Sequence, residues 1–333
     1  MKLFVTGGGG FLGYAIVCQL NAIGHEIATY SRQSYTALKQ LGVSQNLGDL
    51  SDFNALKHAM DGCEAVFHVA AKTGTWGKYK DFYTTNVQGT KNVILACREL
   101  EIRNLIFTSS ASVVFHGKNS EGHNESLPYP KKYNAFYPKT KAVAEQLVIT
   151  ANDDHLKTVC IRPHLIWGPG DPYFLPRLAE RSKKGKLRLL GHPTNLVDCT
   201  YIDNAASAHI LALKQLLHNP IQVEGKTYFI SQDDPIPIAE FINKMLASAD
   251  LPPVSNYVSP KVAYLAGWFL EWFYRTFRIS TEPLITPFLA QQLSSSHWYN
   301  ISASKHDFGY EVGVSIEEGM ERLRKWVLKT SNI

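Results

Sequence analysis

Lys2–Gly13, with the sequence KLFVTGGGGFLG, decides the fold of this chain. The apolar run before the glycines predicts a short strand, and the apolar spacing in Tyr14–Leu20 predicts a helix after them. A strand, a glycine-rich turn and a helix form the context in which such glycines indicate a dinucleotide site. Glycines let the backbone approach a pyrophosphate, and a helix N-terminus supplies N–H donors and partial positive charge. A flexible glycine turn without a ligand is the alternative.

The register of this glycine pattern is open in the sequence. It reads as G-x-x-G-x-x-G from Gly7 or as G-x-G-x-x-G from Gly8, and Gly10 and Gly13 belong to both readings. Both readings place the phosphate-binding turn directly before the same helix.

Apolar runs alternate with helical stretches over the first two thirds of the chain, which predicts an α/β fold with a Rossmann-type, doubly wound parallel sheet. The expected strands are Leu3–Thr6, Ile27–Tyr30, Val43–Leu47, Ala65–Val69, Leu105–Thr108, Thr158–Ile161 and Thr227–Ile230. The expected helices are Phe11–Ile23, Asp52–Met60, Asn86–Leu100, Pro138–Thr150 and Asp203–Leu217. Ligands of such sheets lie outside the carboxyl ends of the strands.

After Ile161 the alternation loosens, and proline, aromatic and basic residues become frequent in 169–186 and 251–287. This predicts a smaller, mostly helical lobe built from separate segments. We expect residues 1–163 and about 200–232 to form the cofactor-binding domain. Residues from about 164 to 199 and from 233 to 333 are expected to form the substrate-binding lobe.

Composition points to a globular enzyme. The chain has 333 residues, of which 45% are hydrophobic, and a net charge of +5 without a long basic run, so we expect no nucleic acid partner. Its five cysteines are scattered and contain no C-x-x-C, which indicates reduced thiols rather than disulfides or zinc ligands. His68, His164 and His192 lack metal-ligand spacing, so we expect packed or hydrogen-bonded side chains and no metal. No leader or spanning segment is expected, which favours the cytoplasm.

Tyr137 and Lys141 lie four residues apart, a spacing that brings a phenol and an ammonium to one face of a helix. Pro138 suits the first helical position, because it has no N–H to leave unsatisfied. A neighbouring cation favours phenolate, so Lys141 should lower the pKa of Tyr137 and let it exchange protons near neutral pH. The alternative is an ordinary solvated pair.

Together these motifs resemble the extended short-chain dehydrogenase/reductase superfamily. The segments that carry the resemblance are Thr6–Gly13 (T-G-x-x-G-x-x-G), Gly48–Asp52 (G-D-L-x-D), His68–Ala71, Asn86–Thr90 (N-V-x-G-T), Phe107–Ala111, Arg162–Asp171 and Tyr201–Asn204. Within the superfamily the chain is most similar to the 3β-hydroxysteroid dehydrogenase branch, and in detail to bacterial 2-alkyl-3-oxoalkanoate reductases of long-chain olefin biosynthesis. The segments behind that finer resemblance are Leu165–Asp171, Pro176–Arg181, Tyr201–Ala206, His297–Tyr299 and Val314–Gly319.

The resemblance implies roles for individual residues. Tyr137 would protonate a carbonyl oxygen as hydride arrives, Lys141 would bond the nicotinamide ribose, and Ser110 would polarise the carbonyl. Ser109 replaces Ser110 if the strand register slips by one. The implied cofactor-binding residues are Gly7, Gly10, Phe11, Leu12, Gly13, Ser31, Arg32, Asp49, Leu50, Ala70, Lys141 and Pro163, with Asp49 meeting the adenine amine.

The cofactor choice depends on the end of the second predicted strand. Family members that use NAD usually carry an acidic residue there for the ribose 2′-hydroxyl, whereas this chain has Ser31 followed by Arg32. A guanidinium can hold a 2′-phosphate, so we expect NADP(H), with NAD(H) as the alternative. A solvated loop arginine is the other interpretation of Arg32.

Three functions compete. The leading hypothesis is an NADPH-dependent oxidoreductase that interconverts 3-oxo and 3-hydroxy groups on a hydrophobic, sterol-like or 2-alkyl-3-oxo acid substrate. A nucleotide-sugar epimerase or dehydratase is the alternative, although such dehydratases place Asp-Glu where this chain has Ala111-Ser112. A non-catalytic NADP-binding regulator should have lost Tyr137, Lys141 or Ser110, and all three are present.

An aromatic segment at 262–278 is too short and too close to charges to span a bilayer. It is also too apolar for an ordinary exposed helix. A core helix is one expectation. The other is a wall of the substrate pocket or a contact with a partner enzyme or with the inner face of a membrane. The sequence leaves monomer and homodimer both open.

Overall fold

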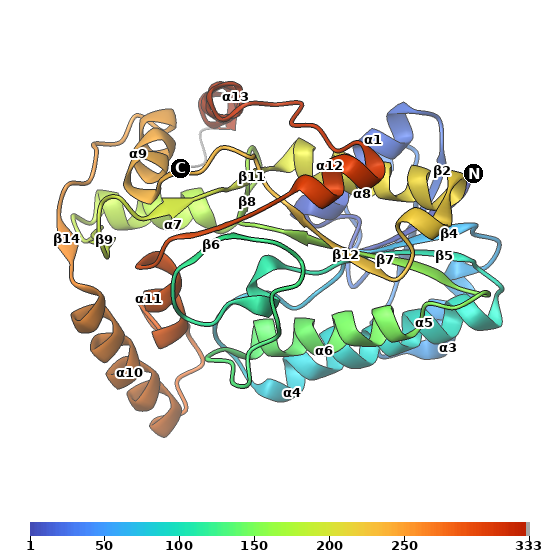
Figure 1. Cartoon of the computed structure of the whole chain (residues 1–333), viewed down its shortest axis with the longest axis horizontal. Helices are drawn as coiled ribbons and strands as arrows, with labels where there is room; N and C mark the ends of the chain where they lie inside the picture. The colour runs from blue at the N-terminus through green and yellow to red at the C-terminus, as the bar shows by residue number, and fades with distance from the viewer. Residues whose placement is uncertain (331–333) are drawn as a thin grey trace.

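A seven-stranded parallel sheet forms the centre of the molecule in the computed structural model, which describes residues 1–330 (Figure 1). Its spatial order is β3, β2, β1, β4, β5, β7 and β12. Chain order therefore reverses between β1 and β4, the switch point at which doubly wound sheets bind ligands. The strands are β1 (Lys2–Thr6), β2 (Glu26–Ser31), β3 (Ser44–Leu47), β4 (Ala65–His68), β5 (Asn104–Thr108), β7 (Lys157–Pro163) and β12 (Lys226–Ile230). The predicted Rossmann-type sheet is confirmed, with every predicted strand within two residues of its observed bounds.

Helices cover both faces of this sheet. One layer contains α1 (Phe11–Ala22) and α8 (Ile202–His218), and the other contains α3 (Phe53–Met60), α5 (Gly89–Glu99) and α6 (Phe136–Thr150). Successive strand residues point to opposite layers: Val5 belongs to the core under α1 and α8, and Phe4 belongs to the core under the other three helices. Burial on both faces explains why the strands are continuous apolar runs rather than alternating ones.

One long helical segment crosses the second layer with an irregular turn inside it. It consists of α4 (Tyr79–Phe82), a π-helical stretch η1 (Tyr83–Gln88) and α5. The sequence predicts a helix only from Asn86, so its start was placed seven residues too late. π-helical turns are rare and occur often at functional sites.

The remaining strands are short, and most of the remaining elements lie at one end of the molecule (Figure 1). The smaller strands are β6 (Ser120–His123), β8 (Ile166–Trp167), β9 (Leu189–Leu190), β10 (Leu196–Val197), β11 (Thr200–Tyr201), β13 (Ile236–Pro237), β14 (Tyr257–Val258) and β15 (His297–Tyr299). The remaining helices are α2 (Thr36–Gln40), α7 (Phe174–Lys183), α9 (Ile238–Ser248), α10 (Pro260–Thr276), α11 (Pro287–Leu293), α12 (Ser302–Phe308) and α13 (Ile316–Thr330), with 3₁₀ turns η2 (Ala111–Val114) and η3 (Pro220–Gln222). The exact two-domain boundaries stay a prediction.

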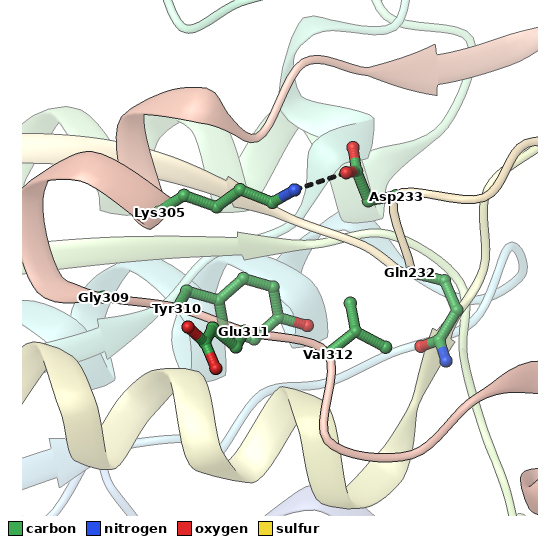
Figure 2. A pocket seen from close by; sticks show the side chains of 7 residues that line it. All are labelled: Gln232, Asp233, Lys305, Gly309, Tyr310, Glu311 and Val312. Atoms are coloured by element: carbon green, nitrogen blue, oxygen red, sulfur yellow. Dashed lines mark hydrogen bonds and ion pairs between the residues drawn. The ribbon is translucent and has the colours of Figure 1, made fainter.

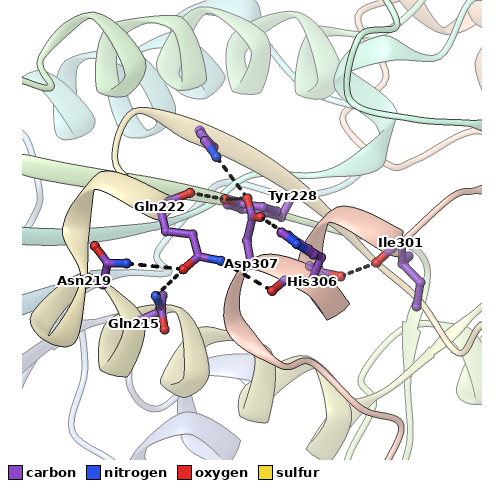
Figure 3. Close-up of polar contacts among 9 residues, drawn as sticks. Gln215, Asn219, Gln222, Tyr228, Ile301, His306 and Asp307 are labelled. Carbon is purple, nitrogen blue, oxygen red and sulfur yellow. Dashed lines mark hydrogen bonds and ion pairs between the residues drawn. The ribbon is translucent and has the colours of Figure 1, made fainter.

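Helix α12 is tied to the edge of the main sheet by a polar cluster (Figure 3). The Asp307 carboxylate accepts hydrogen bonds from the Tyr228 hydroxyl at 2.6 Å and from the Lys226 ammonium at 3.1 Å. His306 adds a bond to the same carboxylate at 2.8 Å. These bonds hold the C-terminal part of the chain against β12.

Helix α10 lies at the periphery and packs mainly against α11 (Figure 1). Its side chains at 262, 265, 268, 269, 272 and 273 are exposed, so the expectation of a plain core helix is wrong. Within residues 1–330, no helix combines the length and apolar character needed to cross a membrane.

Candidate active site

The glycine turn closes on itself so tightly that side chains have no room. Gly7 adopts φ 70°, and a Cβ on Gly13 would lie 2.1 Å from the Gly7 carbonyl oxygen. The Gly10 N–H donates to the same carbonyl at 2.9 Å. Because Gly7, Gly10 and Gly13 contact one another, the structure favours the reading of the pattern that begins at Gly7. Phe11 and Leu12 open α1, whose first N–H groups have no partner within the helix.

The other predicted cofactor residues lie along the same edge of the sheet. Ser31 and Pro163 end β2 and β7, and Ala70 lies just after β4. A Cβ on Gly7 would approach the Ala70 Cα to 2.9 Å, so this loop packs directly against the glycine turn. A turn with this little room can present only backbone to a ligand, which fits a pyrophosphate.

Asp49 and Leu50 lie between β3 and α3. The Asp49 carboxylate accepts from the Ser51 N–H at 2.9 Å and from the Ser51 hydroxyl at 2.7 Å. These bonds, with a smaller contribution from the charge of Arg32, lower the pKa of Asp49. Leu50 is buried, and its carbonyl accepts from the Asn92 amide at 2.7 Å. Arg32 is exposed, and its charge acts on the Asp49 carboxylate.

The predicted catalytic residues converge at the carboxyl end of β5. Tyr137 and Lys141 lie on consecutive turns of α6, and Ser110 lies beside the Tyr137 phenol. Helix α6 begins at Phe136, so the expectation that Pro138 takes the first helical position is wrong: it takes the third. That position still lies in the first turn, where an N–H would have no helical partner.

The Lys141 ammonium is buried and does not bond the Tyr137 phenol in this structure. It donates to the Thr108 carbonyl at 2.5 Å and lies 4.0 Å from the centre of the Phe107 ring. Burial lowers the pKa of Lys141 to about 7, although Glu145 acts in the opposite direction. A lysine with this pKa is poised to change charge near neutral pH.

The expected lowering of the Tyr137 pKa is wrong for this arrangement. Burial raises the pKa of Tyr137, and only the neighbouring Ser110 hydroxyl lowers it. The physical reason is that Lys141 directs its ammonium at a backbone carbonyl, so desolvation of the phenol is left as the larger effect. A raised pKa keeps the phenol protonated, as a proton donor requires.

The choice between Ser110 and Ser109 has a geometric basis. Ser110 caps η2, shares a 2.8 Å hydrogen bond with the Ser112 hydroxyl and lies beside the Tyr137 phenol. The Ser109 hydroxyl is buried and finds no hydrogen-bond partner among the described residues. Because neighbouring residues of an extended chain point to opposite faces, only one of the two can face Tyr137. This favours Ser110, whose role stays a prediction.

Asn86 links helix α6 to the loop after β4. Its amide is buried in the π-helical stretch, accepts from the Lys72 N–H at 2.7 Å and donates to the Lys72 carbonyl at 3.1 Å. It also donates to the Thr140 hydroxyl at 3.0 Å, between Tyr137 and Lys141. The sequence motif marked Asn86 but gave no sign of these partners, which lie 14 and 54 residues away.

The buried histidines are hydrogen-bonded, as expected for His68 and His164. His68 lies between the Thr6 hydroxyl at 2.8 Å and the Thr90 hydroxyl at 2.9 Å. Since Thr90 already donates to the Asn86 carbonyl, it must accept from His68, which is therefore satisfied as a neutral ring. Burial lowers the pKa of His68 to about 3.

His164 forms a pair with His297 that sequence reasoning missed. Their ring nitrogens approach to 2.9 Å, and the outer nitrogens face the carbonyls of Asp198 and Gln292, each at 2.6 Å. Both carbonyls need a donor, so all three bonds require three protons and a net positive charge. Burial lowers the pKa of both rings and so opposes the third proton, whereas the three short contacts favour it.

Distant segments of the chain meet beside the start of α6. A small hollow beside Pro138 is lined by Phe115, Tyr133, Phe288 and Gln291 from three parts of the chain. A larger hollow of about 410 Å³ lies between the end of β12 and the loop after α12 (Figure 2). It is lined by Gln232, Asp233, Lys305, Gly309, Tyr310, Glu311 and Val312, none of which is a predicted site residue. The larger hollow therefore contains none of the residues for which the sequence predicts a catalytic role, and the smaller hollow is the one next to Tyr137.

Comparison with known proteins extends these observations. The model of the 3-beta hydroxysteroid dehydrogenase/isomerase family matches residues 4–259. The 2-alkyl-3-oxoalkanoate reductase of Shewanella oneidensis is 47% identical over 96% of this chain and 85% of that protein. The enzyme of the same name from Stenotrophomonas maltophilia is 47% identical over 97% and 98%. The human sterol-4-alpha-carboxylate 3-dehydrogenase, decarboxylating, is 35% identical over 96% and 86%.

Solved structures share the fold at lower identity. The Bacillus cereus UDP-glucuronic acid 4-epimerase in complex with NAD superposes with a TM-score of 0.75 at 20% identity, covering 99% of both chains. The Thermus thermophilus UDP-glucose 4-epimerase in complex with NAD gives 0.74 at 22% identity, covering 99% of this chain and 100% of the other. At these identities the likeness concerns architecture alone.

Proposed function

Because the chain belongs to the 3-beta hydroxysteroid dehydrogenase/isomerase family, we propose that it interconverts the 3-oxo and 3-hydroxy groups of a hydrophobic substrate with NADP(H). The chain is an oxidoreductase of the extended short-chain dehydrogenase/reductase type, a family that uses a nicotinamide cofactor. Our preferred substrate is a 2-alkyl-3-oxo acid, since two bacterial reductases of that name match nearly the whole chain at 47% identity.

The observation that carries the proposal is that Ser110, Tyr137 and Lys141 meet at the carboxyl end of β5, on the same edge of the sheet as the glycine turn. All lie at the carboxyl edge of the sheet near its switch point. A bound nicotinamide would supply the hydride to the carbonyl carbon. Tyr137 would give its proton to the carbonyl oxygen, and the Ser110 hydroxyl would hold that oxygen as negative charge develops.

The raised pKa of Tyr137 supports the reducing direction, because a neutral phenol is the form that can donate. Lys141, with a pKa near 7, would act through its charge: it stabilises the phenolate left after proton transfer and can bond a ribose hydroxyl. The Thr108 carbonyl that now accepts from Lys141 fixes the direction from which the ammonium approaches.

The preference for NADP(H) rests on Ser31 and Arg32. No carboxylate at position 31 repels a 2′-phosphate, and the exposed Arg32 can reach one near Asp49. A charge-assisted hydrogen bond contributes about 1.5–3 kcal/mol, which corresponds to roughly a ten- to hundredfold difference in affinity.

The test is an assay of the purified protein with NADPH or NADH and four substrates: a long-chain 2-alkyl-3-oxo acid, a short-chain one, a 3-ketosteroid and a UDP-sugar. We expect the highest kcat/KM for NADPH with the long-chain 3-oxo acid. Turnover of the UDP-sugar with none of the 3-oxo compounds would overturn the proposal in favour of an epimerase or dehydratase. The Ala111-Ser112 pair after Ser110 argues against that alternative.

A further inference from the structure

Helix α10 carries its large apolar side chains on the outside, the reverse of a helix packed against a protein core. Its small residues Ala263 and Gly267 face inward, and a Cβ on Gly267 would lie 2.8 Å from the backbone before α11. The large apolar side chains face outward, and we call them the α10 apolar face: Val262, Leu265, Trp268, Phe269, Trp272, Phe273 and Phe277. A core helix has the opposite arrangement, with its large apolar side chains inside.

The α10 apolar face is too exposed to be an incidental surface feature. Leu265 is 64% exposed, Trp268 57% and Trp272 50%. Their spacing of three and four residues places them on one side of the helix. Contiguous exposed apolar patches on soluble proteins mark sites of interaction with a partner, a ligand or a membrane.

The charges around the α10 apolar face indicate which of these occupants the surface fits. Lys261 and Arg278 are exposed at the two ends of the helix. Lys186 and Arg188 lead into β9, which pairs with β14 just before the helix starts. The single acidic residue of α10, Glu271, is already bonded to Arg275 at 2.7 Å. Aromatic rings rimmed by basic side chains, without a free carboxylate, complement an anionic lipid surface.

The inner end of α10 borders the candidate active site. The Arg275 guanidinium lies 5.0 Å from the Trp76 ring and 5.2 Å from the Phe136 ring. Phe136 directly precedes Tyr137, and the Trp76 indole donates to the Ile279 carbonyl at 3.3 Å. A hydrophobic molecule in contact with the outer surface of α10 would therefore be close to the catalytic helix.

We propose that the α10 apolar face rests in the headgroup region of an anionic bilayer and that hydrophobic substrates reach Tyr137 from that side. A helix of 17 residues lying flat would extend about 26 Å along the surface without crossing it. The lipid-binding part stands independently of the proposed reaction, and only the delivery of substrate rests on it.

The first experiment measures sedimentation of the full-length protein with phosphatidylcholine vesicles, with or without about one third phosphatidylglycerol. We expect binding to the anionic vesicles and weakening by salt, because the basic rim contributes electrostatically. The double variant Trp268→Ser/Trp272→Ser should lose at least about tenfold in affinity, since each large apolar side chain removed from lipid costs about 1.5–3 kcal/mol.

The matched control is Ile221→Ser/Leu328→Ser, which removes apolar side chains that are 81% and 63% exposed elsewhere. It should bind vesicles like the unmodified protein. Equal loss in both double variants, or equal binding to neutral and anionic vesicles, overturns the proposal. A concentration-dependent dimer that the Trp268→Ser/Trp272→Ser variant abolishes, without vesicle binding, would identify a second copy as the occupant and also overturn it.

A second experiment locates the helix without disturbing its hydrophobicity. Lipids brominated near the headgroup should quench tryptophan fluorescence, and Trp268→Phe/Trp272→Phe should remove most of that quenching while binding persists. Unchanged quenching in this variant contradicts the assignment. Activity toward a short, water-soluble 3-oxo acid should be equal in all variants. Loss of that activity in the tryptophan variants would mean that Trp268 and Trp272 serve the reaction itself, and it would contradict a role limited to the lipid surface.

Discussion

The two sides of the Tyr137 centre are held in different ways. On the proposed cofactor side, strand ends and the glycine turn make backbone contacts that leave no room even for a methyl group. On the proposed substrate side, half-exposed side chains join distant segments: Glu282 accepts from the Thr75 hydroxyl at 2.6 Å and also pairs with Arg177. Backbone packing is rigid, whereas exposed side-chain pairs contribute little and exchange with water. We therefore expect the proposed cofactor side to be the more rigid of the two and the proposed substrate side to open more readily.

The largest effect is expected from a substitution at Tyr137, where the two sides meet. Tyr137→Phe should lower the rate of carbonyl reduction by roughly a hundred- to ten-thousandfold, because the phenol is the proposed proton donor. NADPH affinity should stay nearly unchanged, since the proposed cofactor site lies on the rigid side. Single-turnover kinetics and fluorescence titration with NADPH measure the two quantities. Near wild-type turnover in this variant would show that another group donates the proton.

The rigid side itself is tested by Gly13→Ala. The added methyl would collide with the Gly7 carbonyl, so we expect a loss of about 1–3 kcal/mol or more in the free energy of unfolding and weakened NADPH binding. Gly313→Ala is the control, because a Cβ there meets nothing closer than 3.7 Å. Chemical denaturation compares the two, and equal stability would refute the close packing described for the turn.

Cofactor preference should change at a single exposed side chain. Arg32→Ala should reduce the preference for NADPH over NADH by roughly ten- to a hundredfold, through loss of one charge-assisted contact. Arg103→Ala, which removes another exposed arginine, should leave the preference intact. A wild-type protein that prefers NADH would contradict the assignment of Arg32 from the start.

Acid should weaken the core between the two sides through its buried histidines. Burial lowers the pKa of His209 to about 4, below the ordinary value of 6.5, so its neutral ring stabilises the fold above pH 6.5. That stability is lost as the pH falls toward 4, at about 1.4 kcal/mol per pH unit and per histidine. Its ring accepts from the Thr108 hydroxyl at 2.8 Å, so His209→Gln preserves a polar partner. The variant should take up about one proton fewer on unfolding at pH 5, and an unchanged pH slope would count against a neutral His209.

The smallest effect is expected on the substrate side. Glu282→Gln weakens a half-exposed contact, so we expect a change of about 0.5–1 kcal/mol at most, seen as a two- to fivefold increase in KM with kcat retained. Glu180→Gln, in an exposed pair with Lys184 on the same helix as Arg177, should change neither constant. A large fall in kcat for Glu282→Gln would mean that this side is as rigid as the other.

The same contrast explains what the sequence could predict. The main sheet, the glycine turn and the meeting of Ser110, Tyr137 and Lys141 follow from local patterns and from the parallel topology, so they could be inferred from short motifs. The direction of the Lys141 ammonium could not, because it depends on a carbonyl 33 residues away. The His164–His297 pair joins residues 133 apart and left no sequence signal. Long-range side-chain geometry is what one sequence does not contain.

The π-helical stretch at Tyr83–Gln88 makes the site sensitive to the number of residues in this part of the chain. Each residue of a regular helix turns it by about 100°, so an insertion or deletion in this stretch would rotate Asn86 away from Lys72 and Thr140. A deletion that restores a regular helix would improve the local hydrogen-bond geometry and yet detach α6 from the loop after β4. The contacts of Asn86 with Lys72 and Thr140 therefore explain why the wider π-helical turn is retained. Natural variants of this protein should tolerate substitutions at exposed positions here far better than any change in residue number.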